Sequence, residues 1–263
     1  MQDGELIRSS VRKNYAKVAK KGAGSGCCGG GGGCCGDTAA DGREASRKAG
    51  YTEEDFANAA QESNMGLGCG NPVALAEIAE GETVLDLGSG GGFDCFLAGR
   101  RVGETGRVIG VDMTPEMIGL ARENARKNET ANVEFRLGEI EHLPVADGTV
   151  DVILSNCVVN LSPDKSQVFA DAYRVLKSGG RLCISDVLAK SEIPEEIKND
   201  RALVCACIGG AAGTEDVAGM LKDAGFGKIE ITEKEGSDEM IRTWAPGSNA
   251  EKYVASFIIR AVK

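Results

Sequence analysis

Histidine is nearly absent from this sequence. His142 is the single histidine among 263 residues, and it stands in the short run Glu141-His142-Leu143-Pro144. A catalytic relay built on imidazole, or a zinc site with several histidine ligands, is therefore improbable. We interpret His142 as a loop residue rather than a catalyst.

Positive charge and long apolar runs are also scarce. The chain has 30 Lys and Arg against 40 Asp and Glu, which gives a net charge of −10 at pH 7. Nucleic-acid binding needs a basic face, so no nucleic-acid partner is expected. No apolar run reaches the roughly 18 residues that span a bilayer, and Met1–Lys21 lacks an apolar signal core. We therefore expect a cytoplasmic protein with no membrane partner.

Cysteine, in contrast, is abundant, with ten residues in the chain. In a reducing compartment these cysteines are not expected to form a static disulfide framework. Metal binding, thiol chemistry and plain burial remain as explanations.

The first 50 residues are expected to form an arm. Val11, Tyr15 and Val18 have helical spacing, which predicts a short amphipathic helix docked on the core, with a partner-binding arm as the weaker alternative. The tract Gly22–Gly36 holds Cys27, Cys28, Cys34 and Cys35 among glycines. Such a tract buries too little to offset its ordering entropy, so we expect it to be mobile without a ligand.

From Tyr51 the pattern becomes that of an α/β protein. Short β-branched or apolar runs alternate with helical patterns, which predicts a Rossmann-like, doubly wound and mostly parallel sheet with an antiparallel edge. The expected strands are Thr83–Leu87, Arg107–Asp112, Val133–Leu137, Val150–Ser155, Arg181–Ser185, Ile229–Glu233 and Val254–Arg260. We expect a cofactor-binding core at 51–186. Residues 187–263 then supply a cysteine-containing substrate segment and complete the sheet.

Three short motifs predict helix ends. Thr114-Pro115-Glu116 and Ser162-Pro163-Asp164 each read as an N-cap, a proline at the first helical position and an acid. Thr214 opens a later helix that Gly225 can terminate.

The glycine-rich stretch after the first strand predicts a cofactor loop. Gly88, Gly90 and Gly92 let the backbone pass close to a ligand at a helix N-terminus. The dinucleotide fingerprint needs a further glycine at position 93, where this chain has Phe93. A pyrophosphate site is therefore disfavoured.

Two carboxylates give this loop its cofactor preference. Asp86 lies two residues before the first glycine, where it can attract the ammonium group of a methionine moiety. Asp112 ends the second strand, where it can accept both ribose hydroxyls. Each charge-assisted hydrogen bond contributes about 1.5–3 kcal/mol. Together they predict S-adenosylmethionine as the cofactor.

Three cysteines fall where a substrate could meet that cofactor. Cys157 follows the fourth strand, Cys207 lies in the segment after the fifth strand, and Cys69 sits in a turn-rich loop before a helix. Cys183 and Cys95 lie inside a strand and a helix pattern, so we interpret both as buried small hydrophobes.

Thiolates select soft, thiophilic centres. Three of them around a pyramidal acceptor leave its lone pair exposed to a sulfonium methyl group. That transfer needs no general base, and holding the partners in line contributes about 7–11 kcal/mol of barrier reduction.

Several stretches of this sequence closely resemble arsenite methyltransferases, which are class I S-adenosylmethionine-dependent enzymes. The loop Gly-Leu-Gly-Cys-Gly-Asn-Pro, the run Ser-Asn-Cys-Val-Val-Asn-Leu and the run Ala-Cys-Ile-Gly-Gly-Ala carry the resemblance most specifically. The matching stretches are Gly66–Pro72, Asp86–Phe96, Gly110–Met117, Gly138–Val145, Ser155–Lys165 and Ala206–Ala211.

The resemblance implies the roles of the cysteines and the cofactor residues. Cys157 and Cys207 would bind trivalent arsenic, and Cys69 and an N-terminal cysteine would join during turnover. Arsenic would arrive as a conjugate of glutathione or another thiol, and a thioredoxin-type partner would restore the thiols. The residues implied to line the cofactor site are Asp86, Gly88, Ser89, Gly90, Asp112, Met113, Ile140, Glu141 and Asn156.

One departure from the family concerns its first functional cysteine, which usually lies nearer the Gly-Leu-Gly-Cys motif. Here we favour Cys35 or Cys34. Cys27 and Cys28 are either spare thiols that capture arsenic or surplus.

Two other functions remain as alternatives. One is a methyltransferase that acts on carbon or oxygen of a small metabolite, with incidental cysteines. The other is a non-enzymatic module that sequesters metal through the four cysteines of Gly22–Gly36.

Overall fold

A seven-stranded sheet forms the centre of the molecule. The computed structural model describes residues 4–21 and 39–263. The strand order is β3-β2-β1-β4-β5-β7-β6, and β7 runs antiparallel to both neighbours, while the other pairs are parallel. This confirms the predicted doubly wound sheet with an antiparallel edge. The strands are β1 (Thr83–Leu87), β2 (Arg107–Asp112), β3 (Val133–Leu137), β4 (Val150–Asn156), β5 (Leu176–Ala189), β6 (Gly227–Glu233) and β7 (Val254–Val262).

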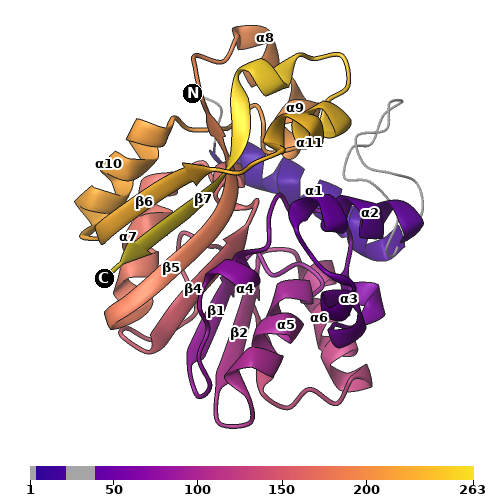
Figure 1. The fold of residues 1–263 in the computed structure, drawn as a ribbon, viewed down its shortest axis with the longest axis vertical. Coiled ribbons are helices and arrows are strands. Elements are labelled where there is room, and N and C mark those ends of the chain that lie inside the picture. The colour runs from indigo at the N-terminus through magenta and orange to yellow at the C-terminus, as the bar shows by residue number, and fades with distance from the viewer. Residues whose placement is uncertain (1–3, 22–38) are drawn as a thin grey trace.

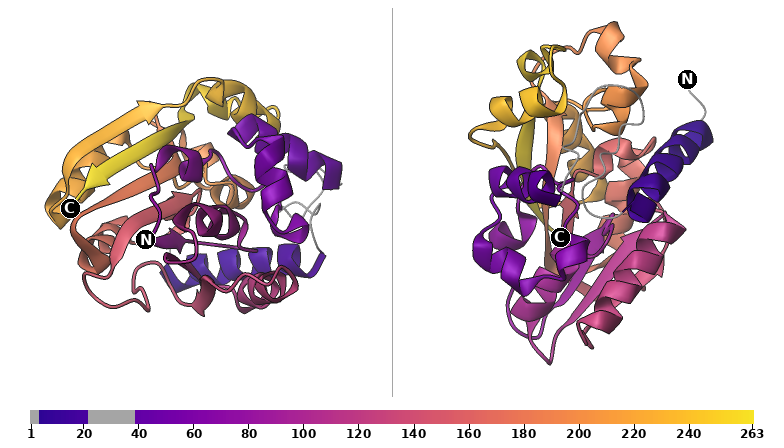
Figure 2. Two further views of the ribbon diagram at one scale, coloured as in Figure 1. Left: turned by 60° about the horizontal axis from the view of Figure 1, so that its bottom comes forward. Right: turned by 90° about the vertical axis from the view of Figure 1, so that its right-hand side faces the viewer.

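Helices surround this sheet (Figures 1 and 2). The helices before β4 are α1 (Gly4–Lys21), α2 (Ala39–Ala49), α3 (Glu53–Asn58), α4 (Pro72–Leu75), α5 (Phe93–Val102) and α6 (Pro115–Lys127). The later ones are α7 (Lys165–Val175), α8 (Glu195–Lys198), α9 (Arg201–Cys205), α10 (Thr214–Ala224) and α11 (Ser237–Trp244). Short 3-10 turns lie at Gln61–Ser63, Val159–Leu161 and Ala250–Lys252. None of the helices in the described part of the chain is long and apolar enough to cross a membrane.

The core has one layer on each face of the sheet. Leu85 and Leu87 of β1 share a buried cluster with residues of α7 and α10, whereas Val84 belongs to the cluster formed with α3 to α6. Successive strand residues point to opposite faces, so a strand buried on both faces must be apolar almost throughout. That is why the central strands are continuous apolar runs.

One of the three predicted helix motifs needs correction. Thr114 and Pro115 begin α6 as expected, but the Thr114 side chain makes no cap hydrogen bond. Helix α7 begins at Lys165, because the Asp164 carboxylate caps it by accepting from the Gln167 amide at 3.0 Å. Ser162 is therefore not the N-cap. Gly213 precedes α10, and Gly225 ends it in a left-handed conformation with φ 106°, as predicted.

The N-terminal helix docks on the core as predicted. Val11 and Val18 of α1 are each 2% exposed, and α1 packs against α6. The tract with Cys27, Cys28, Cys34 and Cys35 lies outside the described residues, so the structure does not test its expected mobility.

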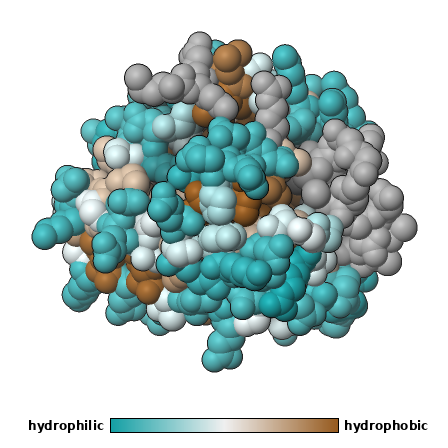
Figure 3. All heavy atoms as spheres, turned by 90° about the horizontal axis from the view of Figure 1, so that it is seen from above, coloured by the Kyte–Doolittle hydropathy of each residue, from teal (hydrophilic) through white to brown (hydrophobic). Residues whose placement is uncertain are grey.

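A smaller apolar cluster lies beyond the parallel strands, where β5 and β7 extend towards α8, α9 and α11 (Figure 1). It contains Cys69, Cys157 and Cys207 together with Val11 of α1. Seen from this end, the surface is mostly hydrophilic with a hydrophobic patch near its centre (Figure 3). The three cysteines singled out from the sequence thus share one buried cluster.

Candidate active site

One cavity gathers all nine residues expected to line a cofactor site. It encloses about 1090 Å³ of empty space, part of it open to solvent. Its lining includes Asp86, Gly88, Ser89, Gly90, Asp112, Met113, Ile140, Glu141 and Asn156. The cavity lies at the carboxyl ends of β1, β2 and β4, which is where open α/β sheets bind ligands.

Backbone hydrogen bonds fix the glycine loop. The amides of Gly88 and Ser89 donate to the Val111 carbonyl at 2.8 and 3.0 Å, which joins the loop to β2. Gly88 has φ +71°, and a Cβ there would lie 2.5 Å from the Val158 side chain. Only glycine fits that position without displacement. The Ser89 hydroxyl is buried without a hydrogen-bond partner and lines the cavity, so a polar ligand can satisfy it.

Asp112 holds the loop and faces the cavity. Its carboxylate accepts from the Gly90 amide at 3.0 Å and from the Thr114 amide at 2.8 Å. These bonds use part of its acceptor capacity and fix its orientation, while its place in the lining leaves it available to a hydroxyl-bearing ligand.

Buried carboxylates make the cavity strongly acidic. Burial and the neighbouring Asp94 charge raise the pKa of Asp86 well above its usual value. Burial raises the pKa of Asp94 to about 6 and also raises the pKa of Asp112. Such carboxylates favour a cationic occupant, because an opposite charge offsets their desolvation. A ligand that carries an ammonium and a sulfonium group fits this donor set.

Tyr51 and Asp94 were missed by the sequence reasoning. The Tyr51 hydroxyl donates to Asp94 at 2.6 Å, and the Asn156 amide group donates to the other Asp94 oxygen at 3.2 Å. Asn156 also accepts from the Cys69 backbone amide at 2.9 Å, so it connects the cavity to the Cys69 loop. An acid in a first helical turn looks like an ordinary capping charge, which is why Asp94 carried no distinct signal.

Helix α1 covers one side of the cavity. Arg8, Val11 and Tyr15 belong to the lining. The Arg8 guanidinium donates to the Glu141 carboxylate at 3.3 Å, and the Ser162 hydroxyl donates to the same oxygen at 2.6 Å. An element more than 100 residues away in sequence therefore holds Glu141 in place.

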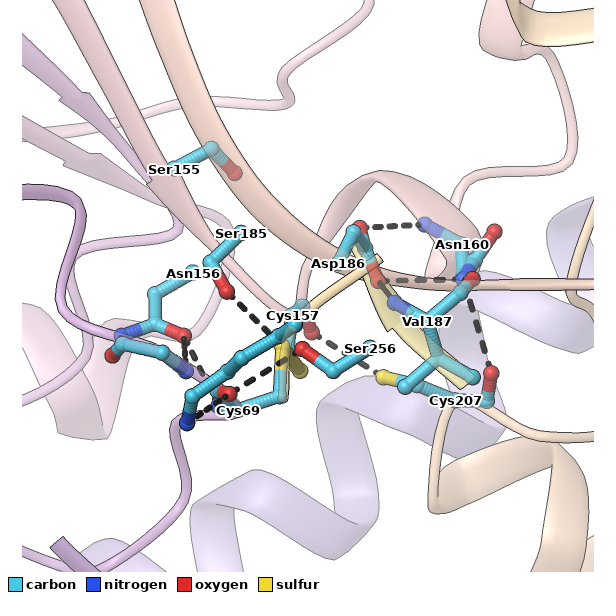
Figure 4. Close-up of a disulfide and its surroundings, with 12 residues drawn as sticks. Cys69, Ser155, Asn156, Cys157, Asn160, Ser185, Asp186, Val187, Cys207 and Ser256 are labelled. Atoms are coloured by element: carbon cyan, nitrogen blue, oxygen red, sulfur yellow. Dashed lines mark hydrogen bonds between the residues drawn. A yellow bond between two sulfur atoms is a disulfide. The ribbon is translucent and has the colours of Figure 1, made fainter. Parts of the chain in front are cut away.

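The structure brings the three predicted cysteines together (Figure 4). Cys69 and Cys157 form a disulfide, and the Cys207 thiol donates to the Cys157 carbonyl at 3.0 Å. The Cys157 and Cys207 sulfurs and a carboxylate oxygen of Asp186 lie within 4.8 Å of one another. Cys69, Cys157 and Cys207 are all at most 5% exposed. They come from the loop before α4, the end of β4 and the turn after α9.

The backbone at two of these cysteines is strained. Cys157 has φ 56° and Cys207 has φ 63°, in the left-handed region that non-glycine residues avoid at a cost of about 1–2 kcal/mol. The Cys157 amide donates to the Ser185 carbonyl at 2.8 Å, and the Cys207 amide to the Val204 carbonyl at 3.1 Å. Strain of this kind collects at functional sites, where the surrounding structure enforces it.

The sulfur cluster differs from the predicted set of three thiolates. Because Cys69 and Cys157 form a disulfide, Cys207 is the one member of the three that carries a free thiol in this structure. Burial raises the pKa of Cys207 well above its usual value, and the Asp186 charge adds to this. Cys207 is therefore a neutral thiol here. Cys34 and Cys35 lie outside the described residues.

The remaining described cysteines have other surroundings. Cys183 is 2% exposed in β5, in agreement with its interpretation as a core residue. Cys95 is buried in α5 as expected, but its thiol also donates to Asp86, a residue of the cavity lining, at 3.2 Å. Cys205 accepts a hydrogen bond from the Asn14 side chain of α1 at 2.9 Å.

A doubly wound sheet with an acidic glycine loop and a cavity suited to a cationic ligand defines an S-adenosylmethionine-dependent methyltransferase. The family model described as "Methyltransferase domain" matches residues 78–225. An arsenite methyltransferase from Halobacterium salinarum is 51% identical across 100% of this chain and 68% of its own length. The chain therefore belongs to the arsenite methyltransferase family of S-adenosylmethionine-dependent enzymes.

Two further comparisons agree. An arsenite methyltransferase from Mus musculus is 36% identical over 86% of this chain and 59% of its own length. The crystal structure of an arsenic(III) S-adenosylmethionine methyltransferase from Chlamydomonas reinhardtii is 35% identical with a TM-score of 0.63, covering 83% of this chain and 73% of that one. The chain thus spans between about half and two thirds of the length of three curated arsenite methyltransferases that it matches.

Proposed function

We propose that this chain transfers the methyl group of S-adenosylmethionine to trivalent arsenic bound by cysteine sulfurs, and so detoxifies arsenite. The observation that carries the proposal is the position of Cys157. Its side chain belongs both to the cofactor cavity and to the sulfur cluster with Cys207. A soft acceptor held by that sulfur is therefore next to the cofactor.

The roles proposed for individual residues follow from this arrangement. Cys157, Cys207 and Cys69 hold arsenic once the Cys69–Cys157 disulfide is reduced. Asp86, Asp94 and Asp112 attract the cationic cofactor, and Ser89 has an unpaired hydroxyl to offer it. Cys34 or Cys35 joins during turnover as the further thiol. The cofactor, when bound, supplies the activated methyl group.

The reducing partner and the location belong to the same proposal. The Cys69–Cys157 disulfide must be opened before three sulfurs can bind one arsenic, which calls for a thiol reductant such as glutathione or a thioredoxin-type protein. Such systems act in the cytoplasm, where we place the chain.

The direct experiment combines the full chain with arsenite, S-adenosylmethionine and either glutathione or a thioredoxin system. Chromatography coupled to mass spectrometry should detect methylated arsenic with at least one reductant and none without any. Pretreatment of the reduced protein with a small alkylating reagent should abolish the product. Its persistence after alkylation would count against a role for the thiols and favour the carbon or oxygen methyltransferase.

The sequestering-module alternative has its own test. A full-length chain with Cys27, Cys28, Cys34 and Cys35 all changed to serine loses the four thiols of the glycine tract but keeps helix α1 and Cys69, Cys157 and Cys207. We expect it to retain stoichiometric binding of arsenite, because the proposed ligands lie in the core. Loss of binding would favour the module.

A further inference from the structure

Asp186 is a buried carboxylate beside the sulfur cluster that the proposed function does not yet use. It lies in β5, is 1% exposed, and has an oxygen within 4.8 Å of both the Cys157 and the Cys207 sulfur (Figure 4). Burial of a carboxylate is costly unless something compensates it. Its position therefore calls for a chemical reason.

Burial raises the pKa of Asp186 to about 6, and hydrogen-bond donors on both oxygens together with the charge of Lys165 oppose that rise. One oxygen accepts from the Val187 amide at 2.8 Å and from the Asn160 side chain at 3.0 Å, and the other accepts from the Asn160 amide at 3.3 Å. Donors directed at both oxygens favour the carboxylate over the acid. No ion pair neutralises Asp186 among residues 4–21 and 39–263. Its oxygens are thus fixed in place, and the charge of Lys165 acts on them without a direct ion pair.

Asp186 lies outside the cofactor cavity, next to a cysteine that lines it. Cys157 belongs to the cavity lining, whereas Asp186 and Cys207 do not. An atom bonded to both sulfurs lies between them and therefore close to the Asp186 oxygen. A methyl group that arrives from the cavity then meets such an atom with the carboxylate close by.

The charge balance of the proposed reaction shows what this carboxylate can do. The arsenic lone pair forms the As–C bond, while the methyl C–S bond of the sulfonium breaks and leaves its electron pair on sulfur. No proton moves. The positive charge that leaves the sulfonium therefore appears on arsenic, deep in a poorly solvated site.

We propose that Asp186 supplies the counter-charge for arsenic as it becomes positive during methyl transfer, which makes it a further catalytic residue of the proposed reaction. A fixed charge aimed at the place where charge develops lowers a barrier without reorganisation. Arsenic(III) selects sulfur ligands over carboxylate oxygen, so Asp186 acts through its charge and not as a ligand. This inference rests on the proposed function.

The test uses Asp186→Asn in the full chain, reduced and loaded with arsenite. The amide keeps the size of the side chain and an oxygen that accepts from Val187 and Asn160, but it removes the charge. We expect the single-turnover rate of arsenic methylation to fall by about 10–100-fold. The affinities for arsenite and for S-adenosylmethionine should each stay within about threefold of the wild-type values. An unchanged rate would overturn the inference.

A structural role for Asp186 makes a different prediction. It would weaken arsenite binding and leave the rate normal once arsenite saturates the site, and that result would also overturn the inference. Asp171→Asn is the matched control, because Asp171 is buried in α7 at 7% exposure and pairs with Arg174 outside the cavity lining. It should leave the single-turnover rate unchanged.

A second pair of variants keeps the test valid if Asp186→Asn does not fold. Asp186→Glu and Asp186→Gln share their length and differ in charge. We expect the Glu variant to be at least about tenfold faster in single turnover, and equal rates would overturn the inference. If the wild-type chain forms no methylated arsenic at all, the proposed function itself fails. Equal rates among the variants of an active enzyme refute only the role of Asp186.

Discussion

The cofactor cavity and the sulfur cluster are built in different ways. The cavity takes Asp86, Asp112 and Asn156 from the ends of neighbouring parallel strands, and backbone amides of its glycine loop join it to β2. The sulfur cluster joins Cys69, Cys157 and Cys207, which are 88 and 50 residues apart in sequence. Two of its three members have strained backbones. The proposed cofactor site is thus built largely on the strand ends of the fold, whereas the proposed arsenic site depends on long-range contacts between loops.

Cys157 is the residue that the two regions share, so its loss should have the largest effect. We predict that Cys157→Ser lowers arsenite methylation by more than about 1000-fold, because the acceptor loses the sulfur that holds it in line with the methyl group. Binding of S-adenosylmethionine, measured by calorimetry, should change by less than about threefold. An equal loss of arsenite methylation and of S-adenosylmethionine binding in this variant would contradict the separation of the two regions.

Cys183→Ala provides the control for that substitution. Cys183 is equally buried, but it packs in the core of β5 and belongs to neither region. It should lose about 1 kcal/mol of unfolding free energy and keep its methylation rate.

A substitution in the cofactor cavity should weaken cofactor binding without affecting the sulfur cluster. Asp112→Asn should weaken S-adenosylmethionine binding by about 10–100-fold, since one charge-assisted hydrogen bond contributes about 1.5–3 kcal/mol. Arsenite binding to the reduced protein should stay the same. Asp151→Asn is the control, because Asp151 accepts from the Thr83 amide at the opposite end of the sheet. Weakened arsenite binding in Asp112→Asn would show that the regions are not independent.

Much of the cofactor half could be predicted from the sequence. The bounds of β1, β2 and β3 agree with the expected strands, because continuous apolar runs between turn residues define them. Asp86 precedes the first glycine by two residues and Asp112 ends β2, so their place in the cavity also followed. In this region the local sequence pattern is therefore enough to place a residue in the folded structure.

The other features of the fold and the site could not be predicted from the sequence, because they depend on contacts between distant segments. β5 was expected at Arg181–Ser185, but it spans Leu176–Ala189, and its pairing with β7 from Arg181 to Ala189 has no signal in the local pattern. Tyr51 and Asp94 meet across 43 residues, and no local period marks either of them. The Cys69–Cys157 disulfide likewise has no local sequence signal; its pairing depends on how the chain folds.

The third prediction concerns the pH dependence of cofactor binding. Burial raises the pKa of Asp94 to about 6, so the folded protein binds more protons than the unfolded chain between about pH 4 and 6, and stability falls as pH rises through that window. A cation binds the ionised form, so affinity for S-adenosylmethionine should rise about tenfold from pH 5 to pH 7. Titration calorimetry checks this.

The same titration on Asp94→Asn tests whether Asp94 causes the pH dependence of cofactor affinity. The rise in affinity with pH should be smaller in this variant, and its unfolding free energy should decline less between about pH 4 and 6. A pH profile identical to that of the wild type would assign the effect to another group.

The smallest expected effect on cofactor affinity comes from helix α1, which lines one side of the cavity. Arg8→Ala removes the guanidinium that pairs with the largely buried Glu141, and we expect about 3–10-fold weaker S-adenosylmethionine binding, typical of a charged hydrogen bond that is partly exposed. Arg12→Ala is the matched control on the same helix, because Arg12 pairs with Glu139 and does not line the cavity. Equal affinities in the two variants would contradict a role for Arg8.

X-ray absorption at the arsenic edge tests the central claim most directly. The reduced full chain, loaded with one equivalent of arsenite, should show arsenic surrounded by sulfur. Cys157→Ser and Cys207→Ser should each replace one sulfur neighbour with a lighter atom. An arsenic environment that both substitutions leave unchanged would contradict the account.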